Sequence, residues 1–369
     1  MAHARGDGAH QYLARPGLRD LDVFDREGLL DPPQDGCLHD VTFLCAASRG
    51  CDSEAIRAAG QSRLESAAVI EEREIRRRRL RLPERGIDLA LVDWGGSGPL
   101  ALLSHANGFC ADVLGLLAER LRPRFRVIGF DSRGHGDSEK PAPPGPYAWE
   151  EFALDVIAVA ERVTRDLARP RVALGVGHSF GGTCVLTAAA RRPDLFERIA
   201  LLDPVILPRA GDPSGWRPPA NAPHPAAEIA RKRAHVFPSR EAAREKWRAR
   251  GTFGDWDPRA LELYLRYAFA DLPDGRIDLK CPGEVEATVY ETGGGFDPWR
   301  EIAGLHVPGL LLHAGRGNFP LPFIEKFCAE SDTLECRSLD AGHLLPMVAP
   351  DLLADALLAW LGPDSPGAA

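Results

Sequence analysis

The sequence predicts an α/β protein in which a mostly parallel sheet is covered by helices on both faces. The first observation is that short, wholly apolar segments alternate with longer segments of helical periodicity between residues 80 and 361. That alternation is typical of parallel strands buried on both sides. The second is that 369 residues, 44% of them hydrophobic and 27% charged, are enough for one large domain or for a domain with an insertion.

Charge and cysteine content exclude several other classes of protein. The formal net charge is −8, so no cationic field spans the chain, and nucleic acid is not an expected partner. The sequence contains neither a run of 18 apolar residues nor a basic-then-apolar leader. We therefore expect a cytoplasmic protein with no membrane partner. The eight cysteines form no Cys-x-x-Cys pair and no zinc-ligand set, so we expect reduced thiols and no metal.

Each element of the predicted sheet follows from local periodicity. A β-hairpin is predicted over 80–93, because apolar residues alternate at period two around the turn Pro83-Glu84-Arg85-Gly86. Further strands are predicted for the short apolar segments at 100–104, 126–130, 171–176, 199–203, 308–313 and 333–339. Helices are predicted for the periodic segments at 111–121, 149–167, 182–191, 321–328 and 351–361. The hairpin adds an antiparallel edge to the otherwise parallel sheet.

A long break between the strands at 199–203 and 308–313 exceeds an ordinary connection. It is rich in Pro and Arg, and it holds four of the seven tryptophans, at 216, 247, 256 and 299. Helical patterns occur within it at 228–250 and 258–269. A polyanion-binding helix at 231–250 is an alternative, but acidic residues interrupt its basic face. We interpret the break as a helical cap, so that the predicted domains are a core of 76–206 and 306–369 with a cap of 207–305.

Residues 1–75 form an N-terminal extension with no sustained periodicity. We expect a weakly ordered segment with a short helix at 53–74, and a regulatory or dimerising arm is the alternative. The run Arg76–Arg79 either forms a polyanion patch or opens a strand. Because Leu80 and Leu82 continue it at period two, the strand is the favoured interpretation.

One motif has a chemical interpretation. The predicted strand at 171–176 runs into Gly177-His178-Ser179-Phe180-Gly181-Gly182, and a predicted helix follows. A G-x-S-x-G sequence between a strand and a helix forms a tight turn that projects the serine oxygen above the sheet. The flanking glycines are required because a Cβ there would collide with neighbouring backbone. We expect Ser179 to be a nucleophile, and a glycine-rich packing turn with an idle serine is the alternative.

With this motif in place, the chain resembles the α/β-hydrolases, in particular the capped, esterase-like kind. The matching motifs, in order, are Ser104-His105-Ala106-Asn107-Gly108-Phe109, Phe130-Asp131-Ser132-Arg133-Gly134-His135-Gly136-Asp137-Ser138, Gly177–Gly182 and Gly342-His343. The resemblance covers about 77–362 except for most of the cap, and residues 1–70 have no counterpart. It implies an eight-stranded, mostly parallel sheet flanked by helices, with the cap inserted after strand 6.

A serine hydroxyl needs a base to accept its proton, and eleven histidines are candidates. The resemblance assigns His343, because the family keeps its base between the last strand and the closing helix. His105 and His135 lie in loops that resemble structural motifs of the family, and His178 belongs to the serine turn. His313 ends a predicted strand, and we interpret it as a core histidine.

The third member of a catalytic triad departs from the usual family pattern. Most relatives place an acid after the seventh strand as G-x-x-D, whereas this chain has Gly315-Arg316-Gly317-Asn318 and no Asp or Glu between 307 and 324. An asparagine does not stabilise an imidazolium as a carboxylate does. We therefore expect Asp203, at the end of the sixth strand, to be the acid, as in some haloalkane dehalogenases and lactonases of the superfamily. The alternative is that Asp203 only caps a loop. Asp340 is close to His343 in sequence, and we interpret it as shaping the turn that presents the base.

Two backbone N–H groups are expected to stabilise the oxyanion that forms on attack. The resemblance implies the N–H of Phe180 and a second from the loop after the third strand, where Phe109 is preferred to Asn107. Asn107, His178 and Trp216 are expected to contact substrate. The aromatic cap indicates an apolar pocket for a small or medium hydrophobic ester.

These residues together predict a cofactor-independent serine hydrolase that acts on carboxylic esters. A lactonase, thioesterase, C–C bond hydrolase or perhydrolase-type enzyme would use the same triad. The alternative outside enzymes is a ligand-binding protein on a degenerate hydrolase scaffold, which is favoured if Asp203 does not reach His343. The expected partner is a small-molecule ester, and a homodimer remains open.

Overall fold

The computed structural model describes residues 75–209, 224–248 and 251–363. The predictions for the N-terminal extension at 1–75, including its helix at 53–74, and for Trp216 lie outside these residues.

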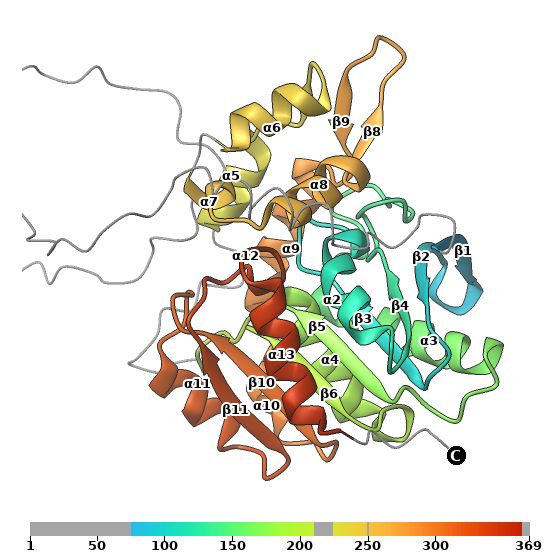
Figure 1. Ribbon diagram of the computed structural model, residues 1–369, viewed down its shortest axis with the longest axis vertical. Helices are drawn as coiled ribbons and strands as arrows, with labels where there is room; N and C mark the ends of the chain where they lie inside the picture. The colour runs from blue at the N-terminus through green and yellow to red at the C-terminus, as the bar shows by residue number, and fades with distance from the viewer. Residues whose placement is uncertain (1–74, 210–223, 249–250, 364–369) are drawn as a thin grey trace, which may run out of the picture. The chain divides into compact units, whose positions relative to one another are not determined.

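In the described residues eight strands form one sheet in the order β1-β2-β4-β3-β5-β6-β10-β11 (Figure 1). Their bounds are β1 (Arg76–Leu82), β2 (Ile87–Gly95), β3 (Leu100–Ser104), β4 (Arg126–Phe130), β5 (Leu174–His178), β6 (Ile199–Leu202), β10 (Gly309–Ala314) and β11 (Leu334–Leu339). β1 pairs antiparallel with β2, β2 pairs antiparallel with β4, and the other pairs are parallel. The predicted sheet class and the antiparallel hairpin at its edge are confirmed.

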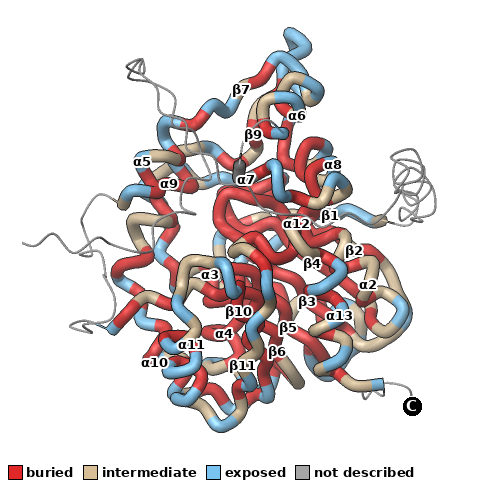
Figure 2. The backbone as a smooth tube through the Cα atoms, turned by 60° about the vertical axis from the view of Figure 1, so that its left-hand side comes forward, coloured by how far each residue is buried: buried red, intermediate tan, exposed pale blue. Residues whose placement is uncertain are grey.

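The central strands are buried along their whole length, which explains their continuous apolar sequence. Every residue of β3, β5, β6 and β10 is buried, and the tube is mostly red in the middle of Figure 2, where these strands are labelled. β5 begins at Leu174 instead of 171, because Val172 makes only an isolated bridge with Phe196 before the ladder starts.

Helices cover both faces of this sheet (Figure 1). On one face α2 (Gly115–Leu121) packs on α13 (Pro350–Leu361). On the other face α4 (Phe180–Arg191) packs on both α3 (Trp149–Asp166) and α10 (Pro298–Ile302). On this second face α11 (Leu321–Cys328) also packs against α10. The ring centroid of Trp299 lies 5.7 Å from that of Phe323 and 5.0 Å from that of Phe327. A 3₁₀ turn over Ala111–Leu114 precedes α2, where one helix over 111–121 was predicted.

Between the neighbouring strands β6 and β10 lies an inserted segment, 207–305. Its described helices are α5 (Pro225–Lys232), α6 (Arg240–Arg248), α7 (Gly251–Gly254), α8 (Pro258–Tyr267), α9 (Gly283–Thr292) and α10. A small antiparallel sheet joins them, in the order β7 (Val236–Phe237), β9 (Ile277–Leu279) and β8 (Phe269–Asp271). The predicted single helix at 228–250 is wrong: α5 ends at Lys232 and β7 follows, and Pro238 cannot lie inside a helix.

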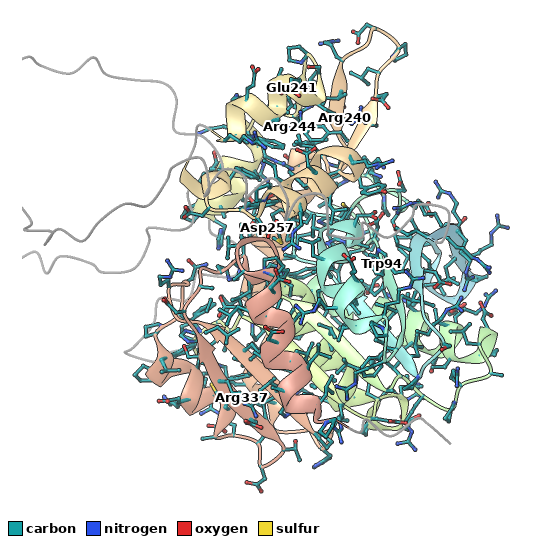
Figure 3. All side chains as sticks on the ribbon, in the orientation of Figure 1. Trp94, Arg240, Glu241, Arg244, Asp257 and Arg337 are labelled. Atoms are coloured by element: carbon teal, nitrogen blue, oxygen red, sulfur yellow. The ribbon has the colours of Figure 1, made fainter. Side chains whose placement is uncertain are left out.

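The inserted segment contacts loops at the carboxyl end of the main sheet. Its buried aromatic residues pack on one another and on Phe109, whose ring centroid lies 5.9 Å from Trp256 and 5.5 Å from Tyr264. Asp257, labelled in Figure 3, caps α8, and its N–H donates to the carbonyl of Met347 at 2.8 Å. The segment is thus fixed to the loop that follows β3 and to the short helix α12 (Leu345–Val348) that comes after β11.

Candidate active site

The sequence motif at the end of β5 forms a sharp turn between strand and helix. Ser179 has φ 55° and ψ −122°, and its N–H donates to the carbonyl of Leu202 at 2.9 Å. A Cβ on Gly177 would lie 2.3 Å from the carbonyl oxygen of Gly181, and one on Gly181 would lie 2.4 Å from that of His105. Only glycine fits at either position, and this close packing presents the Ser179 hydroxyl at the carboxyl edge of the sheet.

The Ser179 hydroxyl lies against the imidazole of His343. The distance between Ser179 Oγ and His343 Nε2 is 2.8 Å. His343 lies in the loop between β11 and α12 (Leu345–Val348), outside any regular element. Its side chain is 17% exposed, so the pair lies at the border between the core and solvent. Folding therefore joins two residues that lie 164 positions apart in the sequence.

Asp203 contacts the other side of the same imidazole. Its Oδ2 lies 2.6 Å from His343 Nδ1, and its Oδ1 accepts the N–H of Ala314 at 2.9 Å. The aspartate directly follows β6 and is fully buried. Because a carboxylate accepts, Nδ1 bears the proton, and Nε2 is left as an acceptor facing Ser179. This is the tautomer that a base needs in order to take a proton from the serine.

In the loop after β10, the main chain and not a carboxylate lies beside Asp203. A Cβ on Gly317 would lie 2.9 Å from Asp203 Oδ2, so the main chain of this loop passes directly beside the aspartate. Asp340, the other candidate near the base, is exposed and pairs with Arg316 at 3.0 Å. Of the carboxylates considered, Asp203 is the one that reaches His343.

Two backbone N–H groups, those of Phe180 and Asn107, have no backbone hydrogen-bond partner among the described residues. Phe180 is the first residue of α4, where an N–H has no partner within the helix and the helix dipole favours negative charge. The N–H of Phe109 instead donates to the carbonyl of Ala106 at 3.3 Å within its own turn. The N–H of Asn107 makes no backbone hydrogen bond to any described residue.

Comparison with known proteins decides the family. The model of the "Alpha/beta hydrolase family" matches residues 100–356.

The chain belongs to the alpha/beta hydrolase family.

Its relatives within this family are hydrolases of several kinds. The "Lipase LipV" of Mycobacterium tuberculosis is 30% identical over 289 residues, which cover 75% of this chain and 99% of the lipase. A 2-(acetamidomethylene)succinate hydrolase of Mesorhizobium japonicum is 40% identical over 108 residues, which cover 29% of this chain and 36% of that protein. Hydrolytic activity is thus supported, while the substrate class differs among relatives.

Solved structures share the hydrolase fold. An E-2-(acetamidomethylene)succinate hydrolase matches with a TM-score of 0.65 and 23% identity, over 78% of this chain and 99% of that one. The thioesterase domain from a curacin biosynthetic pathway matches with a TM-score of 0.62 and 17% identity, over 77% and 99% of the two chains. At these identities the likeness concerns the fold alone.

Two buried histidines of this hydrolase hold the loops around the site. His105 accepts the N–H of Ser132 at 2.9 Å, and His135 accepts that of Gly108 at 3.0 Å. Burial lowers the pKa of His105 to about 4 and that of His135 to about 3. Both imidazoles are therefore neutral and structural. His313 has the same structural role, because its Nε2 lies 2.7 Å from the carbonyl oxygen of Phe319.

Two of the three residues expected to contact substrate make contacts within the protein. His178 is fully buried, and its Nε2 lies 3.0 Å from the carbonyl oxygen of His343, so its side chain faces the protein and not a substrate. The Asn107 amide is also used within the protein, because its Nδ2 donates to the carbonyl of Glu286 at 3.1 Å. Trp216 lies outside the described residues.

A buried ion pair near the site has no signal in the sequence. Arg233, just after α5, lies 2.5 Å from the carboxylate of Glu286 on α9, and both side chains are at most 1% exposed. A Cβ on Gly108 would lie 2.7 Å from Glu286 Oε1, so the carboxylate packs on the loop after β3. The two residues are far apart in sequence, and no local pattern marks either of them.

The described part of the hydrolase has neither a cluster of metal-ligating side chains nor a helix suited to span a membrane. No three His, Cys, Asp or Glu side chains there are grouped so that they could hold a metal ion. Among the helices of the same residues, none combines the length and the apolar character that a membrane span needs.

Proposed function

We propose that this hydrolase is a serine esterase that cleaves carboxylic esters through an acyl-enzyme intermediate. The observation that supports it is the unbroken chain from Asp203 through His343 to Ser179, with distances of 2.6 and 2.8 Å. A nucleophile, a base and an orienting acid in hydrogen-bond reach of one another are the signature of nucleophilic acyl transfer.

The chemistry follows from this order. Ser179 Oγ attacks the acyl carbon as its proton passes to His343 Nε2, and the carbonyl oxygen becomes an oxyanion. His343 then gives the proton to the leaving alcohol, which departs and leaves the acyl group on Ser179. A water molecule, deprotonated by His343, attacks the acyl-enzyme, and the proton returns to Ser179 as the acid leaves. Asp203 orients the imidazole and stabilises its protonated form throughout.

The oxyanion is stabilised by backbone donors at the serine turn. The N–H of Phe180 is the first donor, since it is unpaired at the start of α4. For the second, the N–H of Asn107 replaces that of Phe109, because the latter is bonded to Ala106. Loss of one such donor typically costs about 10²- to 10³-fold in rate.

The expected substrate is a small or medium hydrophobic ester. Support comes from the aromatic residues of the inserted segment, which reach Phe109 in the loop after β3. Thioesters are the second candidate, because acyl-CoA thioesterases of Penicillium are 35% identical over about a third of this chain. Lactonase and C–C bond hydrolase activity would use the same three residues. A non-catalytic binding protein is disfavoured, because Asp203 reaches His343.

Turnover of p-nitrophenyl acetate and labelling by a fluorophosphonate probe test the proposal. Ser179→Ala removes the nucleophile, so turnover should fall by about 10⁴- to 10⁶-fold and labelling should vanish. Ser331→Ala is the matched control: this serine bonds to the carbonyl of Leu305, away from the site, and its variant should behave as wild type. Equal, negligible signals from wild type and Ser179→Ala would favour the binding protein. Phenyl thioacetate in the same assay compares thioesters with esters.

A further inference from the structure

His178, the residue before the nucleophile, is joined to the loop of the base. It is the last residue of β5, and its side chain is fully buried. Its Nε2 lies 3.0 Å from the carbonyl oxygen of His343, and the two rings lie 5.5 Å apart between centroids. Nothing in the proposed acyl transfer uses this contact.

The partner of His178 fixes its tautomer. A carbonyl oxygen only accepts hydrogen bonds, so Nε2 bears the proton and Nδ1 is bare. Among the described residues, Nδ1 has no hydrogen-bond partner. Burial, followed by the nearby charge of His343, lowers the pKa of His178 to about 3. His178 is therefore neutral at working pH and does not oppose the positive charge that forms on His343 during turnover.

The loop that holds His343 is anchored on either side of it: the N–H of Arg316 donates to the carbonyl of Ala341 at 3.0 Å, and the carbonyl of Leu344 accepts the N–H of Met347 at 2.8 Å. These bonds do not reach the main chain of His343 itself. Leu339 ends β11 and Leu345 begins α12, so the residues between them lie in no regular element. The bonds to Asp203 and Ser179 orient the ring of His343, but they do not hold its backbone. Among the described residues, the His178 imidazole is what bonds the carbonyl of His343.

We infer that His178 is a positioning residue that holds the backbone of the base in place. The serine and its neighbour then contact His343 at two points, one on the ring and one on the main chain. This inference rests on the proposed function, because it assigns His178 a role through His343. A base displaced by about 1 Å costs up to about 100-fold in rate, which makes the contact measurable.

Three substitutions separate the hydrogen bond from packing. His178→Gln keeps an amide N–H as far along the side chain as Nε2, whereas the shorter amide of His178→Asn does not reach, and His178→Leu has no donor. With p-nitrophenyl acetate, kcat should fall about 10- to 100-fold in the Leu and Asn variants, with KM within about twofold. The Gln variant should recover most of the loss. Fluorophosphonate labelling of Ser179 should slow in the same order.

Tyr147→Phe is the matched control. It also removes one donor to a carbonyl, since Tyr147 Oη donates to Pro141 at 2.6 Å, and kcat should be unchanged. Wild-type kcat in the Leu and Asn variants would overturn the inference. A wild-type protein that neither turns over nor labels would instead overturn the proposed function.

A measurement on the unmodified protein covers the case in which the variants do not fold. Nitrogen chemical shifts of the His178 ring distinguish its two tautomers. The inference requires a neutral ring with the proton on Nε2 from pH 5 to pH 9. A proton on Nδ1, or a titration within that range, would overturn it.

Discussion

Ser179 and Asp203 share an uncommon backbone conformation. Of the non-glycine residues described by the structure, three have positive φ, namely Ala168 at 51°, Ser179 at 55° and Asp203 at 44°. Such residues cost about 1–3 kcal/mol each and concentrate at functional sites. Backbone bonds hold both in place: the N–H of Ser179 donates to Leu202, and that of Asp203 donates to Leu312 at 2.8 Å. The strained backbone thus lies at the two residues whose side chains contact the His343 imidazole, the proposed nucleophile and the proposed acid.

At the same scale, the effects of two substitutions on kcat test whether Asp203 is the acid. Asp203→Asn keeps the size of the side chain but removes its charge, so kcat for p-nitrophenyl acetate should fall by about 10⁴-fold. Asn318→Ala changes the residue at the usual family position of the acid and should change kcat by less than about threefold, since no described contact joins Asn318 to His343. The reverse ranking would place the acid in the loop after β10.

The residues of the proposed site differ in how readily the sequence alone identifies them. The serine lies in a contiguous motif, and the base lies at a characteristic place between a strand and a helix. Asp203 required elimination, because Asn318 occupies the usual position of the acid. The contact of His178 with the His343 carbonyl was not predictable, because it joins residues that meet only in the folded sheet.

At the scale of elements, strands and helices with one buried face were the most predictable. The bounds of β3, β4 and α11 match the sequence prediction, because a buried strand is a continuous apolar run and an amphipathic helix repeats every 3.6 residues. The small sheet of the inserted segment was missed. Its strands are two or three residues long, too short for any period to appear, and their pairing is set by packing.

The helices α5 and α9 are joined by the buried pair of Arg233 and Glu286. Burial raises the pKa of the Glu286 carboxyl, and the charge of Arg233 opposes that rise. Arg233→Met would leave a buried carboxylate without its counter-charge, so the free energy of unfolding measured with urea should fall by about 3–5 kcal/mol. The double variant Arg233→Met with Glu286→Leu should recover most of this loss, since an apolar pair of similar size is tolerated there.

An exposed pair on α5 supplies the control. Lys232 lies 3.4 Å from Glu228, and its side chain is 77% exposed, so Lys232→Met should change the free energy of unfolding by no more than about 0.5 kcal/mol. If Arg233→Met costs as little as Lys232→Met, the buried pair has no part in holding the inserted segment together.

At the scale of the whole molecule, three buried histidines make the fold sensitive to acid. Burial lowers the pKa of His105 to about 4 and those of His135 and His178 to about 3, from an ordinary 6.5. Below pH 6.5 the unfolded chain therefore binds protons that the folded protein does not, and stability falls as pH falls. Near pH 5 these three groups alone should contribute a slope of about 4 kcal/mol per pH unit.

Urea unfolding at intervals from pH 8 to pH 5 measures this dependence. The midpoint should change little above pH 7 and should fall steeply below pH 6.5. Calorimetry in two buffers of different ionisation enthalpy gives a second measure, the number of protons taken up on unfolding near pH 5. Burial raises the pKa of Asp112 to about 6, so this carboxyl releases about one proton on unfolding near pH 5 and offsets part of the uptake. A flat stability profile would contradict the assignment of three neutral buried imidazoles.

The topology of the main sheet was predictable from the sequence, whereas the contacts of the inserted segment were not. Alternating strands and helices require crossover connections, which place helices on both faces of a parallel sheet. The parallel pairing of the central strands and the antiparallel hairpin agree with that expectation. How the inserted segment meets the loop after β3 and the helix α12 was not predictable, because those contacts join side chains and carbonyls across the fold, as between Asn107 and Glu286.

The run of arginines on β1 has a consequence for the solution behaviour of the protein. Within the described residues β1 pairs with β2 and has no strand on its other side, and Arg76–Arg79 are all exposed. An open strand edge is a template for fibril growth, and charged side chains are a common protection against it. Arg77 and Arg78 pair with Asp112 and Asp166, and a second molecule that docked on this edge would have to strip water from these charged side chains. The same arginines that begin the sheet therefore discourage aggregation at its margin.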